Sequence, residues 1–217
     1  MASLPGGSKI ALATEFSVKK AVTTISNATE AVCSCDTHGL QAGDIIMLYS
    51  GWGRIDNKPF RVKAVTADTF TLEGQHANTS DTKQFSAGGG AGAFAKANTW
   101  VDVLKILKVN TSGGDAKKST FRYLDSENEL EINDGFSAVS RQLDVDADAL
   151  ETAGYAALVS LTASGADTIQ RVTLKNGATS YLACTVAFNE EVKMQDGQVN
   201  AVSAVFSGKS RSTRYAS

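Results

Sequence analysis

The strongest constraint on the fold is a series of short apolar runs separated by turn residues, most of them containing glycine. In the first half these runs lie at residues 45–49, 60–65 and 69–73, with turns at 50–53 and 67–68. Short runs rich in β-branched and aromatic residues, at this spacing, are typical of strands in a small barrel or sandwich. The first half is therefore predicted to be antiparallel β structure.

The second half continues the pattern with longer strands. Residues 99–110 form an extended apolar stretch that predicts one long strand. Further strands are predicted at residues 121–124, 130–132, 136–145, 168–174, 179–188 and 199–206. Asn176-Gly177 separates two of these runs and is a strong hairpin-turn signal.

One segment has helical rather than strand periodicity, and it predicts a helix over residues 147–163. Asp146 or a neighbour can cap its first turn, and Gly165 lies where a helix commonly ends. The residues that recur at helical spacing and predict one apolar face are Leu150, Ala153, Ala157, Leu158 and Leu161. Because this face is rich in alanine, the helix is expected to lie close against a sheet.

These patterns predict a mainly β protein of two packed antiparallel sheets, as a sandwich or barrel, with one flanking α-helix. Residues 1–19 are predicted to form an N-terminal arm and first strand, and residues 208–217 a mobile or partner-bound tail. Residues 20–98 are expected to be a small β-rich inserted or added domain that ends in a glycine-rich linker. Residues 99–207 are expected to form the main β domain.

Composition narrows the function classes. The chain of 217 residues has a formal net charge of -2, so it lacks the overall basic character typical of nucleic-acid-binding proteins. Residues 1–7 do not resemble a secretory signal, and no apolar run approaches the length of a membrane helix. Three cysteines do not suggest a disulfide framework. We expect a soluble protein made in the cytoplasm.

The chain has few residues of the types that form catalytic or metal sites in other proteins. Cys33, Cys35 and His38 lie close together and could bind zinc, but their spacing is unusual and no fourth ligand follows. They are more simply interpreted as small core residues. Cys184 lies in the middle of a predicted strand, which favours a buried structural thiol over a nucleophile. No catalytic site, metal site or cofactor is therefore predicted, and the chain is not expected to be an enzyme.

A run of carboxylates is more informative. Residues 125–151 contain nine acids and one base, Arg141. On an extended strand, Glu127, Glu129 and Glu131 would point to the same side. The simplest interpretation is a solvated strand face. The sharper hypothesis is a surface that repels a polyanion.

Short motifs along nearly the whole chain resemble the tail tube proteins of bacteriophages with long, non-contractile tails. They lie at residues 38–44 (HGLQAGD), 50–52 (SGW), 60–62 (FRV), 68–73 (DTFTLE), 99–103 (TWVDV) and 131–137 (EINDGFS). The alanine-rich helix, the hairpin at Asn176-Gly177 and two closing strands then follow in the family's order.

The resemblance implies a structural subunit that forms hexameric rings, stacked into a tube through which viral DNA passes without specific binding. Its expected partners are other copies of itself, the tape measure protein, and the tail terminator and tail tip proteins. Its expected location is the virion tail, after synthesis in the host bacterial cytoplasm. The 20–98 segment would then decorate the outer wall or belong to the tube sheet.

Two sets of residues are proposed as sites on this basis. Glu127, Glu129 and Glu131, or acids near them, are predicted to face the DNA channel, because a lumen that neutralised phosphates would hold the DNA. Loop and tail residues are predicted to make ring-to-ring contacts. They are Ser112, Gly113, Gly114, Asp115, Lys117, Lys118, Lys209, Arg211 and Arg214.

Two alternatives from the sequence remain open. The chain could be another ring-forming virion component, similar to a tail terminator. It could instead be a β module that binds carbohydrate or a surface, with Trp52 in a turn as an exposed aromatic platform. Trp100 opens an apolar strand and is expected to lie in the core.

Overall fold

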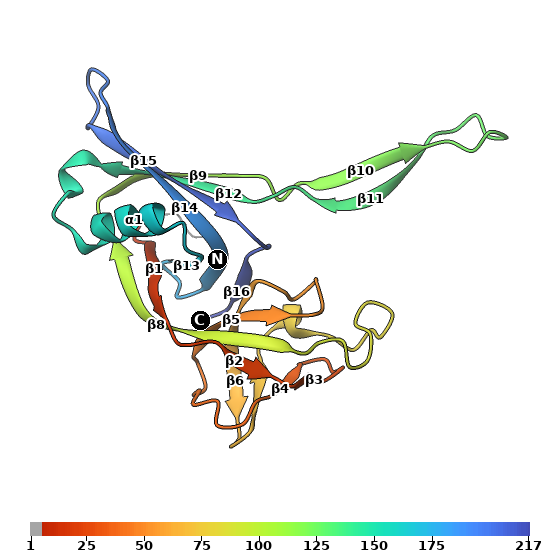
Figure 1. Ribbon diagram of the computed structural model, residues 1–217. Helices are drawn as coiled ribbons and strands as arrows, with labels where there is room; N and C mark the ends of the chain where they lie inside the picture. Colours follow the sequence, from red (N-terminus) through yellow and green to blue (C-terminus); the bar gives the residue numbers. More distant parts are fainter. Residues whose placement is uncertain (1–5) are drawn as a thin grey trace.

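The computed structural model describes residues 6–217, and it confirms a mainly β fold with one α-helix and antiparallel pairing throughout (Figure 1). Its strands are β1 (Lys9–Phe16), β2 (Lys20–Val22), β3 (Thr24–Ile25), β4 (Val32–Ser34), β5 (Ile45–Ser50), β6 (Lys58–Val65), β7 (Thr69–Leu72), β8 (Gly92–Val103), β9 (Ile106–Ser112), β10 (Ala116–Phe121), β11 (Leu130–Phe136), β12 (Ser140–Asp146), β13 (Thr168–Thr173), β14 (Thr179–Lys193), β15 (Ala201–Gly208) and β16 (Thr213–Tyr215). The helical elements are α1 (Ala153–Ser164) and the 3-10 turns η1 (Gln75–Ala77) and η2 (Ala147–Ala149).

Fourteen strands form one curled sheet, and β10 and β11 form a separate hairpin. The order in the sheet is β3-β4-β7-β6-β5-β8-β1-β13-β14-β15-β12-β9, with β2 beside β8 and β16 beside β14. The long strand β8 joins the two parts of this sheet, because its first part pairs with β5 and its second part with β1. The two packed sheets expected from the sequence are thus hydrogen-bonded into one.

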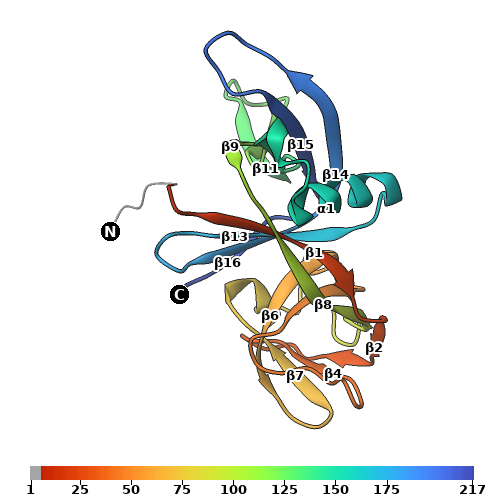
Figure 2. The ribbon, with the colours of Figure 1, turned by 90° about the vertical axis from the view of Figure 1, so that its left-hand side faces the viewer.

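Figure 2 shows the chain as two halves that meet along β8 and β1. We call β2–β7 with the start of β8 the small half, and the rest of the curled sheet with α1 the main half. The core of the small half comes entirely from residues 22–94 and includes Phe60, Phe70 and Phe94. The domain division predicted from the sequence stays a prediction, and its boundary after residue 98 lies inside β8.

The core of the main half lies between the sheet and α1. It includes Leu12, Leu143, Leu158, Leu182 and Phe206, all fully buried. Since these residues come from four different strands and the helix, the helix holds one face of the curled sheet together. A third cluster, with Met47, Ile169, Tyr181 and Tyr215 among its members, fills the space between the two halves.

The helix begins later than the sequence pattern predicted. Asp146 does act as a cap, but for the 3-10 turn η2, where its side chain accepts a hydrogen bond from Asp148 N. Thr152 caps α1 itself, and Gly165 ends it in the left-handed conformation, as expected. Leu150 falls between the two elements and is 64% exposed, so its assignment to the apolar face was wrong.

The helix lies close to the sheet at Gly154. A Cβ atom added there would lie 2.6 Å from the carbonyl oxygen of Asp102 in β8. Only glycine permits this approach, which agrees with the close packing that the alanine-rich face predicted.

Two predicted strands are each interrupted. The stretch 99–110 breaks after β8 at Leu104-Lys105, where Lys105 has a φ of 54°, and it continues as β9 beside β12 instead of β1. The stretch 136–145 breaks between β11 and β12. In both places the apolar pattern continues while the chain changes direction, so periodicity alone could not locate the break.

Candidate assembly surfaces

The most prominent feature is a long hairpin that projects away from the curled sheet (Figure 1). We call β10, β11 and their connecting loop, residues 116–136, the arm. The two strands pair from Ala116↔Phe136 to Phe121↔Leu130 and have no other strand beside them within residues 6–217. The arm exposes large apolar side chains at Tyr123, Leu124, Leu130, Ile132 and Phe136. Because an isolated two-stranded hairpin is marginal in water, an arm of this composition suits contact with another protein surface.

The base of the arm is a defined junction. Gly113 and Gly114 both have positive φ, and a Cβ on Gly113 would collide with the carbonyl oxygen of Ala138. Beyond the glycines, Ser137 N donates to Asp115 O at 2.9 Å. The predicted contact residues 112–115 therefore form the junction between β9 and the arm, which sets the direction in which the arm leaves the sheet.

The acids of this region are arranged differently from the expected strand face. Glu131 lies in β11 and forms an ion pair with Lys118 of β10, at 2.6 Å. Glu127 and Glu129 lie in the loop beyond the strands. The expectation that all three share one strand face was wrong, because β11 begins only at Leu130. Lys117 is exposed on β10. Whether any of these residues faces a channel stays a prediction.

A second hairpin, between β14 and β15, also projects from the main half (Figure 1). Its exposed apolar residues are Val192, Met194 and Val199. Its register shifts between Asn189 and Lys193, so the outer part of the hairpin is less regularly paired than its base. It is a second surface available for contacts between subunits.

The C-terminal segment is not the free tail expected from the sequence. Lys209 forms an ion pair with Asp167 at 2.6 Å, and the guanidinium of Arg211 lies 4.0 Å from the centre of the Phe136 ring, at the end of the arm next to the sheet. Arg214 lies in β16, opposite Ser180 of β14. The prediction of a mobile or partner-bound tail was therefore wrong for residues 213–215, which are part of the sheet.

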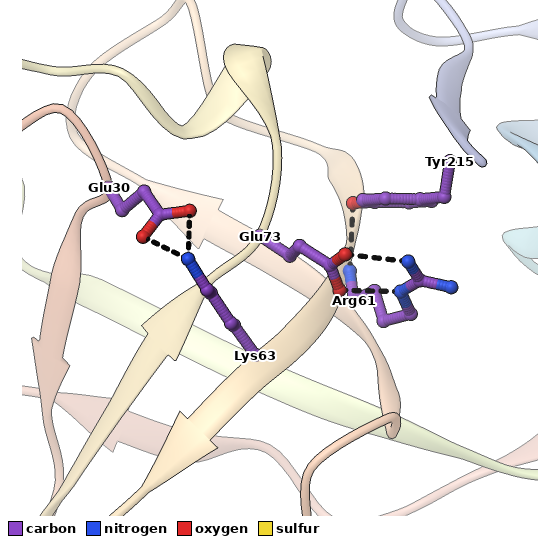
Figure 3. A network of polar contacts seen from close by, with 5 residues as sticks. All are labelled: Glu30, Arg61, Lys63, Glu73 and Tyr215. Atoms are coloured by element: carbon purple, nitrogen blue, oxygen red, sulfur yellow. Dashed lines mark hydrogen bonds and ion pairs between the residues drawn. The ribbon is translucent and has the colours of Figure 1, made fainter. Parts of the chain in front are cut away.

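The end of this segment fastens the two halves together, as Figure 3 shows. The hydroxyl of Tyr215 accepts a hydrogen bond from the backbone N–H of Arg61 in β6 at 2.9 Å, and the Arg61 guanidinium lies over the Tyr215 ring. Arg61 also pairs with Glu73 of the small half. Thr213 adds a hydrogen bond from its hydroxyl to Pro59 O at 2.9 Å. We call residues 213–215 the C-terminal clasp.

The comparison with protein families identifies the kind of protein to which these surfaces belong. The model of the family described as "Phage tail tube protein, TTP" matches residues 50–217, which is more than half of the chain. The chain belongs to this family. No curated protein matches it. The match starts inside the segment predicted to be an insertion, so much of the small half is covered by the family model.

This tail tube protein is thus a structural subunit of the virion tail that assembles with copies of itself into a tube. The family is structural rather than enzymatic. Within residues 6–217, no helix has the length and apolar character of a membrane span. The arm, the β14–β15 hairpin and β9, which is the last strand of the sheet among residues 6–217, are surfaces that fit a role in assembly.

The residues considered for chemistry lie in the tube protein's core. His38 is buried, accepts a hydrogen bond from Leu40 N and contacts Thr66 O through its other ring nitrogen. Among the described residues, no group of three or more histidine, cysteine or acidic side chains could hold a metal ion. Trp52 is only 4% exposed, and its indole N–H donates to Ser86 O. The expected exposed aromatic platform is therefore wrong.

The cysteines are the basis of one prediction. Burial raises the pKa of the Cys33 and Cys184 thiols to about 12, and burial also raises the pKa of Cys35. Because the thiolate is the reactive form, these groups stay protonated and unreactive at about pH 8. Ellman's reagent should leave the native protein unlabelled over minutes and react with all three thiols after unfolding. A thiol that reacts quickly in the folded protein would contradict this burial.

Proposed function

We propose that six copies of this tail tube protein form a ring, and that the rings stack into a tube that conducts DNA into the host. The observation that carries the proposal is the apolar arm, which leaves the subunit and has no partner strand within the described chain. A neighbouring copy of the subunit can cover an exposed apolar surface of this kind. Repeated contacts between identical subunits close into a ring when the rotation closes, and rings that stack make a filament.

The free edge of β9 supports contacts within a ring. β9 pairs with β12 on one side and is the last strand of the sheet among the described residues. Leu107 and Val109 on this strand are close to half exposed. An exposed edge strand with apolar side chains promotes unwanted association unless it is covered. In the proposed ring, a strand of the adjacent subunit covers it, so that the sheets of six subunits join into one barrel.

Contacts between rings are proposed for the arm and the residues that hold it. Lys117 and Lys118 lie on β10, residues 112–115 form its base, and Arg211 connects the C-terminal segment to Phe136. Lys209 and Arg214 flank Arg211 on the same segment. Of these basic residues, Lys118 and Lys209 are paired with Glu131 and Asp167, while Arg211 contacts Phe136 where the arm meets the sheet. The loop of the arm is acidic, so it suits a basic surface on the next ring.

The remaining partners follow from the proposed tube. The tape measure protein would occupy the lumen before DNA does, and terminator and tip proteins would cap the ends. A lumen that does not neutralise phosphates would let DNA pass without holding it. That Glu127, Glu129 and Glu131 contribute to this surface remains a proposal, as does synthesis in the host cytoplasm.

Negative-stain electron microscopy of the purified, concentrated protein tests the proposal. Hollow tubes built from six-fold rings are the expected result, with an initiator complex added if the protein alone stays monomeric. Single rings that never stack would favour the alternative of a terminator-like component. Rings with another symmetry, or monomers that persist with the initiator present, would contradict the proposal.

A further inference from the structure

The core of the main half is open at one end. A cavity of about 830 Å³ lies where α1 does not cover the curled sheet. Its apolar wall comes from β1, β9 and β13 through Ile10, Leu107, Val109 and Val172, among others. It adjoins the buried core, since Ile10 belongs to that core and Val172 packs against it. An apolar space of this size is large enough for several side chains.

A buried cation in this cavity has no counter-ion. Arg141 of β12 is 9% exposed, and its guanidinium donates a hydrogen bond to the side-chain oxygen of Gln170. Within residues 6–217 no carboxylate lies within ion-pair distance of it. The side-chain nitrogen of Gln170 and the hydroxyl of Ser8 are buried without hydrogen-bond partners among the described residues. Burial also lowers the pKa of Arg141.

An unpaired buried charge is costly, and a guanidinium binds a carboxylate through two parallel hydrogen bonds. Lys108 and Arg214 also line the cavity, and none of its described lining residues is acidic. The cavity is therefore complementary to a segment that combines a large apolar side chain with a carboxylate.

The loop of the arm has this combination. Residues 122–129, which we call the tip, contain three acids and one arginine. Leu124 is fully exposed and Tyr123 is 60% exposed, and Asp125 follows directly. Hydrogen bonds within the loop involve the Ser126 backbone and side chain and leave the Asp125 carboxylate free.

We propose that the tip of one subunit inserts into this cavity of a neighbouring subunit, with Leu124 against the apolar wall and Asp125 paired with Arg141. The tip must come from another copy because the arm extends away from the sheet that contains the cavity (Figure 1). The inference rests on the proposed assembly and names the receptor for its arm.

Cysteine cross-linking between two variants tests the docking. Leu124→Cys and Val109→Cys proteins are mixed, assembled and oxidised, and dimers are counted on a non-reducing gel. Because each variant carries only one of the two new cysteines, a disulfide between positions 124 and 109 must join two chains. The native cysteines are buried, which keeps the background low. We expect a dimer band from this pair. Val65→Cys, at an exposed site in the small half, is the control for Val109→Cys and should give roughly tenfold less dimer or lower still.

The charge pair is tested in the same assay. Asp125→Asn changes an exposed loop residue, so folding is preserved, and it should lower the yield of cross-linked dimer by roughly fivefold or more, since it removes one partner of a buried ion pair. Glu151→Gln, at another exposed acid, is the matched control and should leave the yield unchanged. An equal yield with Asp125→Asn would overturn the pairing with Arg141.

The outcomes separate this inference from the function on which it rests. Tubes that form normally without the disulfide between positions 124 and 109 would overturn the docking and leave the tube function intact, and the tip's acids could then face the lumen. A disulfide that forms instead between Met194→Cys and Val109→Cys would show that the β14–β15 hairpin occupies the cavity. This result would overturn the docking of the tip. A wild-type protein that never assembles would contradict both proposals.

Discussion

Replacing the arm with a two-residue turn should abolish tube formation while the rest of the subunit stays folded. In this variant, Asn-Gly replaces residues 116–136, between Asp115 and Ser137, whose backbones already pair. None of the deleted residues is buried in the core. The curled sheet and α1 therefore keep their packing, and we expect the melting temperature to change by only a few degrees.

The loss of assembly should be nearly complete, because the arm carries five large apolar side chains that are exposed on the subunit. Electron microscopy would show monomers under conditions in which the wild type forms tubes. Circular dichroism and a thermal melt serve as the control for folding. If the armless protein were added to growing wild-type tubes, it should also fail to be incorporated. Tubes of normal length from the armless protein would show that the arm is not needed for assembly.

Local features of the fold were predictable where a short motif determines the geometry. The Asn176-Gly177 turn joins β13 to β14 with Gly177 at a φ of 84°, and Gly165 ends α1. Cys184 is fully buried in β14, as its place in an apolar strand indicated. In each case the residues that set the structure lie within a few positions of one another.

Features that depend on distant residues were missed. Trp52 lies in a turn, but it is covered by Phe85 and bonded to Ser86, both far along the chain. Asp146 and Thr152 are both good caps, and only the packing of α1 against the sheet shows which one starts the helix. The cavity at Arg141 combines segments from both ends of the chain, so no local pattern could indicate it.

The C-terminal clasp was missed for the same reason, because serines and basic residues around Tyr215 resemble a mobile tail. The hydrogen bond from Arg61 to Tyr215 joins positions 154 residues apart. Residues 213–215 complete the cluster between the two halves, where Tyr215 packs edge-on against Tyr181. The segment is therefore expected to stabilise the arrangement of the halves as well as the sheet.

Tyr215→Ala should strongly destabilise the subunit. The side chain is 6% exposed, and removal of a buried aromatic ring costs about 3 to 5 kcal/mol in the free energy of unfolding. Tyr215→Phe keeps the ring and removes only the acceptor for Arg61 N–H, so it should cost about 1 kcal/mol. Urea denaturation of the two variants measures both values. Tyr123→Ala, on the exposed tip, is the control and should cost less than about 0.5 kcal/mol.

The hydroxyl of Tyr215 should also make the stability of the subunit depend on pH in the alkaline range. Burial raises the pKa of Tyr215 from 10.0 to about 12, so the folded state favours the neutral phenol. This contribution to stability is complete below about pH 10 and is lost as the pH rises towards about 12. Buried cysteines should cause a similar loss of stability at high pH in the wild type and in Tyr215→Phe. The difference between these two proteins therefore reports on Tyr215 alone. Tyr215→Phe should therefore lose less stability than the wild type between about pH 10 and 12. Equal losses would contradict the burial of the Tyr215 hydroxyl in the clasp.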